Sequence, residues 1–269
     1  MPIRGVALVL RRCGVHPSTP HSSEFRAPCV WAFLSSLRKN GLFSNLLANR
    51  FRSDVVRAKL SIYRFDPDSN EQPRYDTFEI DTESGETVLS ILIKVNEDYD
   101  SSLSFRFACG KVKCGECSIM VNKTPCLACN RKIEPEMIID PLPNLPVIKD
   151  LVIDRNKAIN KIVELAPSLL ESKVDGAMTL ESHIIDTYIK LTSCFECLIC
   201  QSVCHVLKDK PDQFIGPLGL LWLAQTALTD ANIGKEMRDV AQMCESCGMC
   251  WGACPSEINF LEDAIRRCN

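Results

Sequence analysis

The chain contains sixteen cysteines in 269 residues, and most of them lie three to five residues from another cysteine. Cysteine side chains form disulfides in secreted proteins, and as thiolates they bind zinc or iron–sulfur clusters. Disulfide scaffolds are short and loop-rich, and they do not require cysteines at such close spacing. We therefore interpret the clustered cysteines as metal ligands rather than as disulfide partners.

Two groups in the second half of the chain share the spacing Cys-x2-Cys-x2-Cys-x3-Cys, which is the run of bacterial ferredoxins. In ferredoxins with two clusters, the fourth cysteine of each run binds the cluster of the other run. The spacing therefore predicts two [4Fe–4S] clusters. One would be held by Cys194, Cys197, Cys200 and Cys254, and the other by Cys204, Cys244, Cys247 and Cys250.

An earlier group has the plant-type spacing for a [2Fe–2S] cluster, with Cys-x4-Cys-x2-Cys and a fourth cysteine twelve residues later. Gly110 and Gly115 lie in this loop and allow the backbone to approach a cluster closely. Cys126 is an alternative fourth ligand, but the position of Cys129 fits the pattern better. A zinc knuckle would show two paired cysteines instead. The predicted ligands are Cys109, Cys114, Cys117 and Cys129.

Other catalytic patterns are missing from the sequence. It has no phosphate-binding glycine-rich loop, no nucleophile elbow and no dinucleotide fingerprint. His205 follows a predicted ligand, and both a structural role and a role in tuning a cluster are open to it. We therefore predict electron transfer, with no bond-making chemistry in this chain.

The composition is that of a soluble globular protein, with 46% hydrophobic and 24% charged residues. The net charge of -3 gives no support for nucleic-acid binding. No apolar run reaches the about 18 uncharged residues of a membrane-spanning helix. Any association with a membrane would therefore depend on a partner.

The elements that must position these cysteines fall into three parts. Residues 1–54 are rich in arginine and serine and poor in acids, as in a transit peptide or in sequence translated upstream of the true start; both explanations stay open. Residues 55–150 show strands over Ala58–Phe65 and Tyr75–Ile80 and a helix over Thr87–Asn96, preceded by turn and capping residues from Asp81 to Gly85. This predicts a small α+β domain that ends after the proline-rich segment 141–146.

The third part, residues 151–269, is predicted to be all-α. Apolar residues recur at helical spacing over 159–165, 184–191, 220–228 and 233–241, and a short final helix is expected after Ser256. Pro217 suits the first turn of the third of these helices. The last two cysteine groups follow the second and fourth helices directly.

The sequence resembles the iron–sulfur subunit of succinate dehydrogenase and fumarate reductase. The resemblance covers about 58–254 and rests on Cys114-Gly115-Glu116-Cys117, on Leu127-Ala128-Cys129 and on the segments 141–152 and 211–217. It implies a β-grasp first domain docked on a flavoprotein subunit that binds FAD and a dicarboxylate. It also implies electron transfer through the three clusters to a quinone at membrane anchor subunits, on the cytoplasmic face in a prokaryote or the matrix face of the mitochondrial inner membrane.

Three departures from the family's pattern are visible. Most members hold a [3Fe–4S] cluster in the third position, with an aliphatic residue where this chain has Cys247, so we expect a second [4Fe–4S] cluster instead. His205, Lys208 and Asp209 replace a proline and paired tryptophans near the quinone, and Glu245 replaces a histidine. The alternatives are therefore the iron–sulfur component of a thiol-dependent fumarate reductase or heterodisulfide-type complex, and a free ferredoxin-like carrier.

Overall fold

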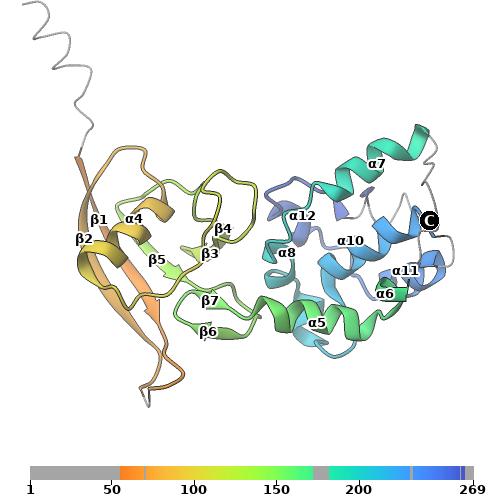
Figure 1. Cartoon of the computed structure of the whole chain (residues 1–269), viewed down its shortest axis with the longest axis horizontal. Helices are drawn as coiled ribbons and strands as arrows, with labels where there is room; N and C mark the ends of the chain where they lie inside the picture. Colours follow the sequence, from red (N-terminus) through yellow and green to blue (C-terminus); the bar gives the residue numbers. More distant parts are fainter. Residues whose placement is uncertain (1–54, 70, 172–181, 231–232, 261, 264–269) are drawn as a thin grey trace, which may run out of the picture. The chain divides into compact units, whose positions relative to one another are not determined.

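The computed structural model describes residues 55–69, 71–171, 182–230, 233–260 and 262–263, which belong to one compact unit (Figure 1). The basic extension 1–54, with Cys13 and Cys29, lies outside the described residues. So do Cys268 and most of the segment where the short final helix is expected. No helix among the described ranges is long and apolar enough to cross a membrane.

The first half is a five-stranded sheet with the strand order β2-β1-β5-β3-β4. The outer hairpin is β1 (Val55–Arg64) and β2 (Arg74–Glu83), and β1 pairs in parallel with β5 (Glu136–Asp140). Strands β3 (Ser118–Val121) and β4 (Thr124–Leu127) form the second hairpin. Alternate residues of β1 are fully buried, as expected for a strand with one face on the core. Together with the helix described next, this is the predicted β-grasp fold.

One helix, α4 (Val88–Lys94), packs its apolar residues Val88, Ile91 and Leu92 on the sheet (Figure 1). Its N-cap is Thr87, which forms a capping box with Ser90. The turn expected over 81–85 is shorter in the structure, because β2 continues to Glu83. The chain continues beyond α4 as a π-helix, η1 (Val95–Tyr99).

A buried arginine fixes the segment that leads into the first cysteine group. Arg64 is 6% exposed, and its Nε lies 3.1 Å from Asp150 Oδ1. Asp150 also accepts hydrogen bonds from the backbone N–H groups of Phe65 and Ser104. Arg64 also pairs with Asp100, whose pKa falls to about 2 because Ser102 and Arg64 both donate to its carboxylate. This network ties β1 to the chain just before Cys109.

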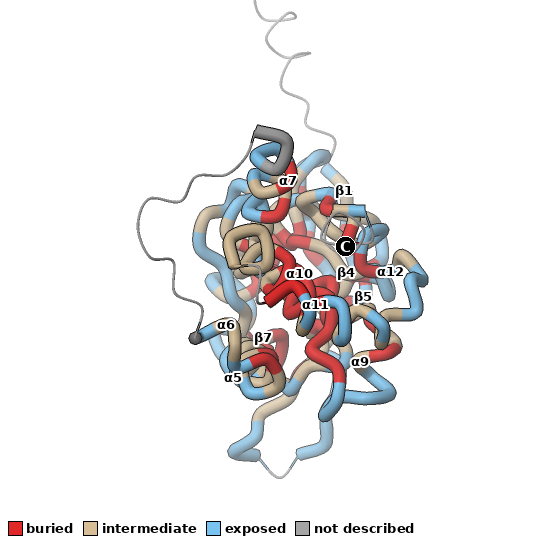
Figure 2. The backbone as a smooth tube through the Cα atoms, turned by 90° about the vertical axis from the view of Figure 1, so that its right-hand side faces the viewer, coloured by how far each residue is buried: buried red, intermediate tan, exposed pale blue. Residues whose placement is uncertain are grey.

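The second half is helical apart from the short hairpin of β6 (Val147–Lys149) and β7 (Val152–Ile153). The longest helix, α10 (Gly216–Ala227), is apolar on nearly all sides and is mostly buried (Figure 2). A helix that is hydrophobic all round belongs in a core, and the other helices surround α10. They are α5 (Arg155–Leu165), α6 (Ser168–Glu171), α7 (Ser182–Thr192), α8 (Ile199–Ser202), α9 (His205–Asp209), α11 (Ile233–Ala241) and α12 (Met249–Gly252).

Candidate iron–sulfur sites

Two cavities in the helical half are each lined by four cysteines. Each cavity takes three cysteines from one group and the last cysteine from the other, as the spacing predicts. The first cavity is lined by Cys194, Cys197, Cys200 and Cys254, and the second by Cys204, Cys244, Cys247 and Cys250. Phe260 lines both cavities and is 3% exposed, so its ring is a wall that they share.

The two groups repeat the same backbone geometry. Glu196 and Ser246, one residue before the second cysteine of each group, have φ values of 52° and 54°. Leu198 and Gly248, one residue after it, have φ values of 63° and 76°. Non-glycine residues seldom adopt this left-handed conformation, and such residues are concentrated at functional sites. In each group it is followed by one turn of helix, α8 or α12, that carries the third cysteine.

Burial disfavours free thiolates in these cavities. It raises the pKa of Cys194 and Cys197 to about 11 and that of Cys250 to about 12, and it raises the pKa of Cys200 well above its ordinary value. Iron ligands must be thiolates, so positive charge in the cavity has to offset this cost. Backbone N–H groups also point at the sulfurs, as in the 3.3 Å contact from Glu196 N to Cys194 Sγ. The donor set and the cavities fit [4Fe–4S] clusters.

Single metal ions fit the site less well. Among the described residues, no three His, Cys, Asp or Glu side chains converge in a way that could hold one ion. A zinc site would bring its ligands within about 2.3 Å of a single point. Ligands of a multi-iron cluster lie farther apart than those of a single zinc ion.

The first cysteine group forms a loop between η1 and β3. Lys111 N–H donates to Cys109 Sγ at 3.3 Å, and Cys109 N–H donates to Cys114 Sγ at 3.5 Å. The backbone donors at Lys111 and Lys113 lower the pKa of Cys109 to about 7. Backbone donors directed at sulfur are what a [2Fe–2S] loop requires.

The two candidates for the fourth ligand lie in different surroundings. Cys129 lies close enough to Cys117 to influence the pKa of the Cys117 thiol. Ala128 N–H also donates to Cys117 O at 2.9 Å, and α4 holds this segment through Leu89 N–H to Ala128 O at 3.0 Å. Cys126 is in β4, where burial raises its pKa to about 11. The geometry thus favours Cys129.

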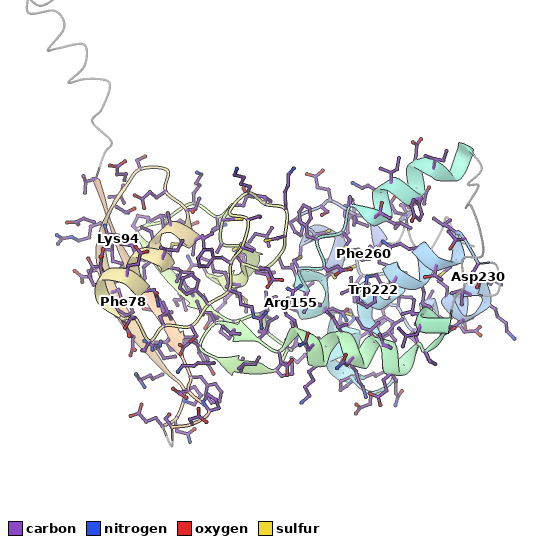
Figure 3. The ribbon with its side chains drawn as sticks, in the orientation of Figure 1. Phe78, Lys94, Arg155, Trp222, Asp230 and Phe260 are labelled. Atoms are coloured by element: carbon purple, nitrogen blue, oxygen red, sulfur yellow. The ribbon has the colours of Figure 1, made fainter. Side chains whose placement is uncertain are left out.

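The first-group loop and the second group are in direct contact. Gly115 has φ of 70°, and a Cβ built there would lie 2.5 Å from Phe195 O and 2.9 Å from Cys197 Cβ. Arg155, the first residue of α5, reaches both loops, with Nη2 2.6 Å from Glu196 O and Nε 3.7 Å from Glu116 Oε1 (Figure 3). Sequence reasoning missed both contacts, because no local pattern signals them.

Comparison with known proteins adds independent evidence. A family model for a 2Fe-2S iron-sulfur cluster binding domain matches residues 59–160, and one for a 4Fe-4S dicluster domain matches residues 190–258. The succinate dehydrogenase iron-sulfur subunit of Paracoccus denitrificans is 30% identical over 217 residues, which are 75% of this chain and 83% of that protein. The chain belongs to the family of succinate dehydrogenase and fumarate reductase iron–sulfur subunits.

Two other relatives are longer than this chain. A component of the fumarate reductase (CoM/CoB) of Methanothermobacter marburgensis is 29% identical over 77% of this chain, but the match covers only 43% of that relative. An uncharacterized iron-sulfur protein of Methanocaldococcus jannaschii is 30% identical over 78% of this chain and 42% of its own length. The chain therefore spans about two fifths of these relatives.

A solved structure shares the fold. A chain of the Mycobacterium smegmatis Sdh1 complex in the apo form superposes with a TM-score of 0.70 at 24% identity, covering 80% of this chain and 94% of that one.

Two residues that depart from the family's pattern meet beside the second cavity. His205 Nε2 lies 2.8 Å from Glu245 Oε2, and each residue directly follows a cysteine of that cavity. Cys247 is exposed, unlike Cys197 at the equivalent place in the first group, which is buried. The second cavity is therefore the more open to solvent at this position.

Proposed function

We propose that the chain is the electron-transfer subunit of a succinate dehydrogenase/fumarate reductase complex. Cys109, Cys114, Cys117 and Cys129 would hold one [2Fe–2S] cluster, and the two cysteine-lined cavities would hold two [4Fe–4S] clusters. Iron–sulfur clusters, when bound, accept and release single electrons. The dicarboxylate chemistry would lie on the partner flavoprotein, so this chain has no catalytic residue of its own in the proposal.

The observation that carries this proposal is the pair of cavities with exchanged fourth cysteines, in a chain of this family. In this proposal the cysteines would hold the clusters, and backbone N–H groups directed at their sulfurs would offset part of the negative charge. The direct contact of the Gly115 loop with Cys197 supports a short path between the [2Fe–2S] site and the first cavity.

The proposed partners are those that membership of this family implies. We propose a flavoprotein subunit with FAD at the [2Fe–2S] end, and membrane anchor subunits with a quinone at the end near the second cavity. The chain would then be a peripheral membrane protein on the cytoplasmic or matrix face.

Cys247 gives the second cavity a complete set of four cysteines. We propose a [4Fe–4S] cluster there, in place of the [3Fe–4S] cluster of most members. Its potential would be lower, since cluster type and net charge set the potential. EPR of the oxidised, anaerobically purified protein tests this, and a stoichiometric three-iron signal would refute it.

A second candidate function is suggested by the relative from the fumarate reductase (CoM/CoB), together with the replaced residues around His205 and Glu245. In this case, the chain would serve a thiol-dependent fumarate reductase or heterodisulfide-type complex.

Purification from the native cells under anaerobic conditions separates the candidates. Co-purification with a flavin-carrying subunit and membrane subunits supports the first, and a complex free of membrane subunits supports the second. Recovery of the chain alone, with all its iron, would instead indicate a free carrier and overturn both.

A further inference from the structure

Arg155 lies between the first two cluster sites and is largely shielded from solvent. Its side chain is 11% exposed. It contacts one residue in each of two cysteine groups, and each of these residues lies between two cysteines. On one side Glu116 lies between Cys114 and Cys117, and on the other side Glu196 precedes Cys197. Figure 3 shows Arg155 at the start of α5, where the sheet-containing half meets the helices.

The guanidinium is only partly satisfied by these contacts. Among the described residues, Arg155 Nη1 is buried and has no hydrogen-bond partner. A buried donor without a partner costs free energy, and the cost is larger when the group is charged. The carboxylate of Glu116 lies 3.7 Å from Nε, which is beyond ordinary hydrogen-bond distance. The contacts with Glu116 and Glu196 therefore compensate the positive charge of Arg155 only in part.

Stabilisation of the helix does not account for this residue. Arg155 is the first residue of α5, whose N-cap is Asp154. The helix macrodipole favours negative charge at that end and disfavours a cation. Neither helix initiation nor packing alone explains an arginine at this position, because its positive charge is unfavourable at the N-terminus of a helix.

The neighbouring cavity offers the missing negative charge. Arg155 Nη2 lies 2.6 Å from the carbonyl oxygen of Glu196, between two cysteines of the first cavity, so its positive charge lies beside those sulfurs. Four thiolates outweigh the positive charge of an oxidised [4Fe–4S] core, and each added electron makes the site more negative. A fixed cation close by therefore favours the reduced form.

We propose that Arg155 is a positioning residue that raises the reduction potential of the [4Fe–4S] cluster in the first cavity while holding the [2Fe–2S] loop against it. This inference rests on the proposed function, because it requires a cluster in that cavity. The Arg155 side chain would thus have two roles. It would hold the two sites together, and it would raise the reduction potential of one of them relative to the other.

The test is a redox titration, followed by EPR, of the full chain purified anaerobically. Arg155→Met and Arg155→Gln remove the positive charge. Arg155→Lys keeps the charge but lacks the planar guanidinium with its several N–H donors. The matched control is Arg57→Met, because the Arg57 side chain is 71% exposed and pairs with Asp81 on the outer hairpin. The second [4Fe–4S] cluster is an internal reference, since Arg155 bonds to the Cys194–Cys197 loop.

We expect both neutral variants to show about a tenfold lower reduced-to-oxidised ratio of the first cluster at a fixed potential, which is about 59 mV for a one-electron couple. The Arg155→Lys and Arg57→Met variants should stay close to the parent protein. If the two neutral variants lost iron while Arg155→Lys kept it, this result would also show that the site requires a positive charge at residue 155.

An unchanged potential in both neutral variants with full iron content would overturn the inference. An equal shift, or an equal loss of iron, in all three Arg155 variants would overturn it too, because packing alone would then explain the residue. Failure of the proposed function is distinguishable, because the unmodified chain would then lack the iron and sulfide of a [4Fe–4S] cluster.

Discussion

Gly115 lies so close to Phe195 that a Cβ at Gly115 would be 2.5 Å from the Phe195 carbonyl oxygen. The atom in the way is backbone, which cannot move aside as a flexible side chain would. A glycine of the [2Fe–2S] loop thus determines how closely the two ligand loops approach each other.

Gly115→Ala should therefore lower stability more than Gly110→Ala. Both glycines have left-handed φ values, but a Cβ at Gly110 meets no atom within 4 Å. We expect about 1 kcal/mol from strain alone in Gly110→Ala, and about 3 kcal/mol in Gly115→Ala, where overpacking adds to strain. The apparent thermal midpoint at a fixed heating rate, followed by cluster absorbance, measures the difference. Equal midpoints would contradict the role of close contact.

Cys247→Ser should convert the second cluster to a three-iron form. Cys247 is the exposed member of the second cavity, so the other three cysteines can still hold a cluster after its loss. We expect about one iron fewer per chain and a new EPR signal in the oxidised protein. The neighbouring Ser246→Ala variant is the control and should keep all its iron. Full iron content in Cys247→Ser and also in Cys247→Ala, which has no side-chain donor atom, would exclude Cys247 as a ligand.

Cys129→Ala and Cys126→Ala should differ in their [2Fe–2S] content. Cys129 lies beside Cys117, whereas Cys126 is held in β4. We expect Cys129→Ala to lose the two irons of this site and Cys126→Ala to retain them, as measured by iron analysis and by EPR of the reduced protein. The reverse pattern would assign the fourth ligand to Cys126.

Tyr75 should ionise at unusually high pH. Its hydroxyl donates to Asp140 Oδ1 at 2.5 Å, and this bond, with burial, raises the pKa of Tyr75 to about 12. Because the folded pKa is above the ordinary value of 10.0, the bond stabilises the fold below about pH 10 and is lost as the pH rises through 12. NMR of ¹³C-labelled tyrosine, assigned with Tyr75→Phe, measures the titration. Asp140→Asn should move the pKa back toward 10, and no movement would refute the assigned cause.

Local patterns predicted much of the fold. Alternating apolar residues predicted β1 and β2, and helical spacing predicted α4, α5, α7, α10 and α11. The short strands β3 to β7 and the short helices α6, α8, α9 and α12 were not predicted from local patterns, since they have too few residues to show a period. The extension of β2 to Glu83 was missed because Asp81, Thr82 and Glu83 resemble turn residues, yet Thr82 is buried.

The cysteine spacing was more informative than any periodicity. It predicted which cysteines share a cavity, although Cys200 and Cys254 are far apart in the sequence. It gave no sign of Arg155, whose partners lie in two other segments of the chain. Nor did it predict the left-handed backbone at Glu196 and Leu198, because neither residue type favours that conformation.

Cys204 and Cys254 each close one cysteine group but line the cavity of the other. Neither cavity can therefore be completed until the chain from Cys194 to Cys254 has folded back on itself. If both cavities hold clusters, as proposed, cluster insertion and folding would be coupled, and loss of one cluster would also weaken the site of the other. The two sites would then depend on each other for their assembly.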